Sequence, residues 1–141
     1  MARKWTSFKG LMKQPQIVLA VLLRYSYGNI PISQLKKLPL DILQKIARSE
    51  HCTSQLRDQM EIMIAFKRAQ SFQDYHLVYC KARYINHDVE RLAYEKAVKL
   101  GKATIKKTNS LKELKEIASQ AIAFNDELKE LAERKIAILE K

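Results

Sequence analysis

Residues with the chemistry to bind a metal ion are few and fall into two pairs. His76 and Cys80 stand four residues apart in a stretch of helical periodicity, a spacing that can present two ligands to one ion. His51 and Cys52 are adjacent, which is not a usual zinc spacing. A cysteine at a helical position is more often a small buried hydrophobic residue than a ligand. We therefore predict no metal site and no cofactor.

Catalytic chemistry has no better support in the sequence. His87 is followed by Asp88, a pair that the start of a helix explains better than an acid–base couple. None of the three glycines of the chain belongs to a nucleophile elbow, a P-loop or a dinucleotide-binding motif. We predict that the protein has no catalytic residue and is not an enzyme.

The elements that carry these residues are predicted to be helices. The chain of 141 residues contains only three glycines and three prolines, too few for the turns of a β-sandwich or β-barrel. Its length suits a single domain, over residues 1–141. We expect an all-α fold of about seven helices, with two N-terminal helices followed by three α-hairpin repeats stacked as a short solenoid or bundle.

The repeat prediction depends on an alignment of residues 71–100 with residues 110–139, which needs no gap. Seven of the aligned positions, offset by 39, are identical: Ser71/Ser110, Ala82/Ala121, Asn86/Asn125, Leu92/Leu131, Ala93/Ala132, Lys96/Lys135 and Leu100/Leu139. A more divergent copy covers residues 38–69, after basic N-terminal helices in residues 1–37. Amphipathic helices that coincide by chance are the alternative.

Turn and cap residues predict where these helices begin and end. Ser110 and Glu113 have the spacing of a capping box, and Asn125 with Asp126 suits a turn that caps the next helix. Residues 101–109 begin with a glycine and lack apolar periodicity, so we expect a C-cap at Gly101 followed by a linker.

Charge is concentrated near the N-terminus. The formal net charge is +11, and residues 1–40 contribute seven basic residues and no acidic one. Such a segment attracts anionic partners, either phosphates of RNA or DNA or an acidic protein. An anionic membrane surface is a third option, through Trp5 and Phe8. The residues proposed to contact the anion are Arg3, Lys4, Lys9, Lys13, Lys36 and Lys37.

The longest apolar run, residues 17–23, has seven residues, far fewer than the roughly 20 of a membrane-spanning helix. Charged residues flank this run and no signal-peptidase site follows it. We therefore expect a cytoplasmic location, with no export through a cleaved signal peptide.

The middle hairpin is rich in tyrosine and arginine, as protein interfaces are. Tyr94 aligns with Glu133, so we expect it to be exposed. The residues proposed to bind a partner protein are Tyr79, Lys81, Arg83, Tyr84, Arg91 and Tyr94. A locally tyrosine-rich core is the alternative.

Two short segments resemble known families. Residues 38–46, LPLDILQKI, resemble the opening of an F-box, although the later F-box motifs are missing. The acidic C-terminal tail, with Leu139 near its end, is similar to that of type IV-secreted effectors of intracellular bacteria, which include short lysine-rich helical-repeat proteins. The second resemblance implies delivery into a host cell. With the hairpins, it favours a non-catalytic adaptor or effector that binds a protein, and an RNA- or DNA-binding domain is the alternative.

Overall fold

The computed structural model describes residues 15–22 and 30–141, and every regular element in these residues is a helix. This confirms the predicted all-α fold. Seven of the described helices have eight residues or more, and α3 is a single turn. Their bounds are α2 (Pro15–Leu22), α3 (Ile32–Leu35), α4 (Leu40–Arg48), α5 (Ser54–Arg68), α6 (Phe72–Ala82), α7 (His87–Lys107), α8 (Leu111–Ala121) and α9 (Asp126–Leu139).

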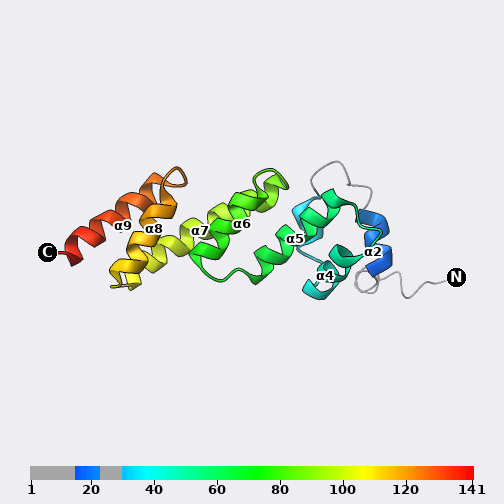
Figure 1. The fold of residues 1–141 in the computed structure, drawn as a ribbon, viewed down its shortest axis with the longest axis horizontal. Coiled ribbons are helices and arrows are strands. Elements are labelled where there is room, and N and C mark those ends of the chain that lie inside the picture. Colours follow the sequence, from blue (N-terminus) through cyan, green and yellow to red (C-terminus); the bar gives the residue numbers. More distant parts are fainter. Residues whose placement is uncertain (1–14, 23–29) are drawn as a thin grey trace.

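The helices form an elongated row that starts at α2 and ends at α9 (Figure 1). Three hairpins, α4/α5, α6/α7 and α8/α9, follow one another along this row. Contacts between hairpins connect α5 to α6 and α7, and then connect α6 to α8 and α7 to α9. Each hairpin thus packs on its neighbours in the sequence, which is the arrangement of a short solenoid.

The helices of the second and third hairpins start at equivalent positions. α6 and α8 start 39 residues apart, and α7 and α9 do as well. Asn86 and Asn125 cap α7 and α9 with their side chains. Their own backbone N–H groups donate to the carbonyl oxygens of Ala82 and Ala121, at 3.0 and 2.9 Å. These equivalent helix starts fit the offset of 39 between the two aligned segments. That both hairpins descend from one repeated unit stays a prediction.

The predicted linker at residues 101–109 is wrong for most of its length. α7 continues through Gly101 to Lys107, and only residues 108–110 separate it from α8. A Cβ atom at Gly101 would lie 3.0 Å from a methyl carbon of Leu128 and 3.2 Å from the Phe72 ring. This glycine therefore lets α7 approach α9 and α6 closely inside the helix, and it does not form a C-cap.

The described residues bury two apolar clusters along the row. The first extends from α2 to the adjoining halves of α6 and α7, and it includes Val78 and Val89. The second lies between α6, α7, α8 and α9, and it includes Phe72, Ile105 and Leu128. Because α6 and α7 contribute to both clusters, the middle hairpin joins the two ends of the molecule.

Candidate protein-binding surface

Two of the proposed binding residues, Tyr79 and Tyr94, are half-buried where the third hairpin packs on the second. Their rings are 5.7 Å apart, and each has its centroid 5.0 Å from that of Phe124. The Tyr94 hydroxyl accepts a hydrogen bond of 2.9 Å from Asn125 Nδ2. The expectation that Tyr94 is exposed is therefore wrong, because Phe124 in the α8–α9 turn packs against it. These tyrosines join two hairpins.

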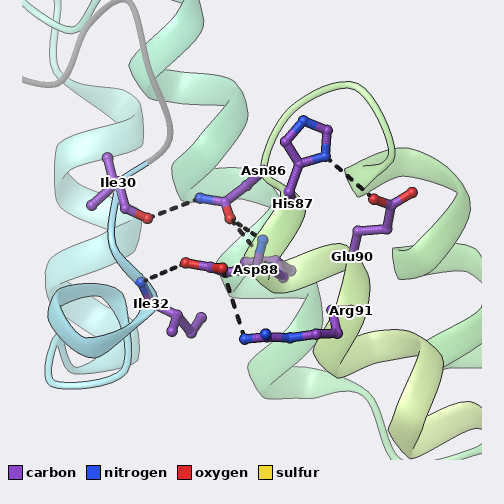
Figure 2. A network of polar contacts seen from close by, with 8 residues as sticks. Ile30, Ile32, Asn86, His87, Asp88, Glu90 and Arg91 are labelled. Carbon is purple, nitrogen blue, oxygen red and sulfur yellow. Dashed lines mark hydrogen bonds and ion pairs between the residues drawn. The ribbon is translucent and has the colours of Figure 1, made fainter.

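Arg91, another of the proposed binding residues, is exposed in the second turn of α7 and pairs with Asp88. Its guanidinium is 3.8 Å from the Asp88 carboxylate, whose other oxygen accepts a hydrogen bond of 3.5 Å from Ile32 N (Figure 2). His87, which is next to Asp88 in the sequence, faces Glu90 instead, with 3.4 Å between His87 Nδ1 and Glu90 Oε1. The side chains of His87 and Asp88 therefore contact different partners and do not interact as a pair.

A buried polar network beside this pair fixes the segment that precedes α3. Asn86 Nδ2 donates to the Ile30 carbonyl oxygen at 3.1 Å (Figure 2). It also donates to Gln59 Oε1 at 3.0 Å. Gln59 Oε1 also accepts from Ile30 N at 2.8 Å. Asn86 and Gln59 are almost fully buried, so these bonds replace the water that their amides have lost. The network is structural and positions the segment after residue 29 against α5 and α7.

The remaining proposed residues, Lys81, Arg83 and Tyr84, are exposed at the end of α6. Tyr84 has 87% of its surface exposed, and the Arg83 guanidinium lies 5.7 Å from the centre of its ring. Leu77, which the sequence analysis missed, is 54% exposed on the same helix. Leu77 and Lys81 are four residues apart on α6, so they share one face, and Tyr84 lies in the turn that follows the helix.

A shallow hollow of about 160 Å³ lies beside this face, between the end of α5 and α6. Two cations, Arg68 and Lys81, lie at its edge together with Leu77. Asp74 also lines it, but its carboxylate accepts hydrogen bonds from the backbone N–H groups of Gln70 and Ser71, at 3.0 and 3.3 Å. These bonds lower the pKa of Asp74. We call the surface made by Arg68, Leu77, Lys81, Arg83 and Tyr84 the α6 face.

The two histidine–cysteine pairs do not converge. His76 packs against Phe72 and Phe124, with ring centroids 5.8 and 4.9 Å away, and burial lowers its pKa. Cys80 Sγ is 3.9 Å from His76 Nε2. Burial raises the pKa of the Cys52 thiol, which lies in the α4–α5 turn. In the described ranges, no three His, Cys, Asp or Glu side chains gather as metal ligands do.

Of the residues proposed to bind an anion, Lys36 and Lys37 are exposed in the turn between α3 and α4. Lys67 Nζ donates to the Lys36 carbonyl oxygen at 3.3 Å, which adds a third cation to this turn. Arg3, Lys4, Lys9 and Lys13 lie outside the described residues, as do Trp5 and Phe8. Among the helices of residues 15–22 and 30–141, none has the length and apolar character to cross a bilayer.

Comparisons of the chain with protein-family models, with curated proteins and with solved structures found no match.

Proposed function

We propose that this protein is a non-catalytic interaction module that binds an acidic segment of a partner protein through the α6 face. The observation that carries the proposal is Leu77, an apolar side chain that is more than half exposed next to a hollow. Arg68 and Lys81 flank it, so an apolar residue of a partner would enter a cationic rim.

Tyr84 extends this surface beyond the hollow. Tyrosine offers a large, rigid contact area together with a hydroxyl group, and tyrosine and arginine are enriched among residues that dominate binding energy. Arg83 covers part of the Tyr84 ring, so the pair can meet both apolar and acidic groups of a partner. Stacked hairpins hold this surface on rigid helices, as solenoid proteins commonly do.

The adaptor or effector role is part of the same proposal. A protein that acts by holding a partner needs a fixed surface and no reacting group. The resemblance of the acidic C-terminal tail to type IV-secreted effectors supports delivery into a host cell, and a cytoplasmic location fits an adaptor.

The test compares two exposed apolar residues on different helices. A photo-crosslinking amino acid is placed at Leu77 on α6 or at Ile138 on α9, which are 54% and 65% exposed. Crosslinking is carried out in cells, and captured proteins are identified by mass spectrometry after nuclease treatment. We expect a discrete acidic protein to be captured from position 77 and not from position 138.

Binding of the captured protein is then measured with purified variants. Leu77→Asp places an acidic group in a cationic rim, and Tyr84→Ala removes a large contact. Each is expected to weaken binding about tenfold or more, which corresponds to roughly 1.4 kcal/mol. Ile138→Asp serves as the matched control. Equal losses for Leu77→Asp and Ile138→Asp, or a capture that nuclease abolishes, would contradict the proposal.

A further inference from the structure

The second half of α7 has an unusual concentration of positive charge. From residue 96 to residue 107 it has five lysines and no acidic residue. Ala97, Gly101 and Ile105 are the buried positions of the same segment. The lysines lie at the other positions of the helix. All but Lys102, which is half-buried, are exposed. We call Lys96, Lys99, Lys102, Lys106 and Lys107 the α7 lysine stripe.

Neighbouring carboxylates neutralise little of this charge. Within residues 15–22 and 30–141, Lys102 is the one stripe lysine with an ion pair, at 3.1 Å from Glu127. Lys135 of α9 brings one more ammonium group to the end of the stripe, because its Nζ donates to the carbonyl oxygens of Ile105 and Lys106 at 2.6 and 3.1 Å. These bonds satisfy the C-terminal carbonyls of α7. The outward lysines are therefore left to an external anion.

We propose that the α7 lysine stripe binds the phosphate backbone of a double-stranded nucleic acid, independently of its sequence. At about 1.5 Å of rise per residue, the stripe is roughly 16 Å long, with a lysine about every turn. Duplex DNA carries about one negative charge per 1.7 Å of its axis, so several phosphates can lie opposite ammonium groups that are spread along one helix face. Ammonium groups spread along one helix face suit contacts to phosphates, which carry no sequence information directly.

The surroundings of the stripe favour a duplex over a single strand. Proteins that bind single strands stack the bases on aromatic side chains. Tyr84 is the strongly exposed aromatic residue of the described ranges, and it lies beyond the opposite end of α7. A membrane surface fits less well, because the large exposed apolar side chains of these ranges all lie outside residues 96–107.

The experiment measures binding of a fluorescein-labelled 20-bp DNA duplex by anisotropy between 50 and 300 mM salt. The test variant changes Lys99, Lys106 and Lys107 to glutamine. The control variant changes Lys45, Arg48 and Lys67 of the first hairpin to glutamine, so both variants lose the same net charge from exposed side chains. We expect the test variant to bind at least tenfold more weakly at 100 mM salt. Its salt slope should fall by about 2.7, since each phosphate contact contributes roughly 0.9. The control should stay within twofold of the parent protein.

Three results would overturn this inference. An equal loss in both variants would show that net charge alone attracts the duplex. A larger loss in the control would move the contact to the α4/α5 hairpin. Tighter binding of a 20-nucleotide single strand, or of vesicles with anionic lipid, would change the class of ligand. Leu77→Asp changes the α6 face and not the α7 lysine stripe, so it should leave duplex binding unchanged. A failure of this inference can therefore be distinguished from a failure of the proposed function.

Discussion

The α6–α7 turn and the α8–α9 turn use the same residue in different ways. Asn86 and Asn125 both accept hydrogen bonds from the first backbone N–H groups of the following helix. Their amide nitrogens differ in what they contact. Asn86 Nδ2 donates to a backbone carbonyl 56 residues away and to a buried glutamine, whereas Asn125 Nδ2 donates to the Tyr94 hydroxyl.

This difference separates a local role from a long-range role of one side chain. The capping oxygen depends only on the helix that follows it, so it works equally well in both turns. The amide nitrogen is available to whatever packs beside the turn. At Asn86 that neighbour is the segment before α3, and at Asn125 it is the preceding hairpin. The asparagine of the middle hairpin, Asn86, therefore makes more tertiary hydrogen bonds than Asn125 does.

The largest expected effect comes from exchanging these amides for carboxylates. Asn86→Asp keeps the cap but aims a negative charge at the Ile30 carbonyl oxygen and at Gln59 Oε1, neither of which can donate as placed. We expect a loss of about 3 kcal/mol in the free energy of unfolding, measured with urea. Asn125→Asp should be nearly neutral, because the Tyr94 hydroxyl can turn and donate to the new carboxylate.

The double variant Asn125→Asp with Tyr94→Phe is the control for that explanation, because it removes the donor. It should be less stable than Asn125→Asp alone by about 1 kcal/mol. Similar losses for Asn86→Asp and Asn125→Asp would show that both amides serve only their caps.

A smaller effect on stability is expected at Gly101, where α7 of the middle hairpin contacts α9 of the last hairpin. Gly101→Val adds atoms where a Cβ would already lie 3.0 and 3.1 Å from the Leu128 methyl carbons. We expect a loss of about 2 kcal/mol from overpacking, measured by urea denaturation. Gly101→Ala should lose less, since alanine gains up to about 1 kcal/mol in helix propensity.

The equivalent position in the last hairpin is Glu140, which pairs with Lys115 at 3.2 Å on an exposed surface. Glu140→Val should therefore change stability by less than about 1 kcal/mol. A Gly101→Val variant as stable as the parent would mean that α7 and α9 can move apart freely.

The smallest effect concerns pH and the junction at His76. Burial lowers the pKa of His76 in the folded protein below its ordinary value of about 6.5. Between the folded pKa and about pH 6.5, the unfolded chain binds more protons than the folded protein. The free energy of unfolding therefore falls as the pH drops from about 6.5 through the folded pKa. His76→Phe keeps an aromatic ring beside Phe72 and Phe124 and removes the titratable imidazole. Urea midpoints between pH 5 and pH 8 should vary less in His76→Phe than in the parent. Curves of the same slope would contradict this.

Helix starts were predictable because they depend on nearby capping residues. Ser110 and Asn125 cap the helices that follow them, as the sequence indicates. Gly101 and Tyr94 were misinterpreted because their environments come from α9 and the α8–α9 turn. A glycine inside a helix and a glycine after one look alike in sequence, and only the close approach of Leu128 distinguishes them. Tyr94 is half-buried because Phe124 packs on it, and the exposure of Leu77 depends on how α5 packs against α6.

The sharing of α6 and α7 between two apolar clusters has a consequence for the order of opening. α8 and α9 contribute to the second cluster only, so they can detach while the first cluster stays intact. Backbone amides of α8 and α9 should then exchange with deuterium faster than those of α5, and those of α7 should change along its length. The exchange rate along α7 would then increase from the end near His87 to the end at Lys107.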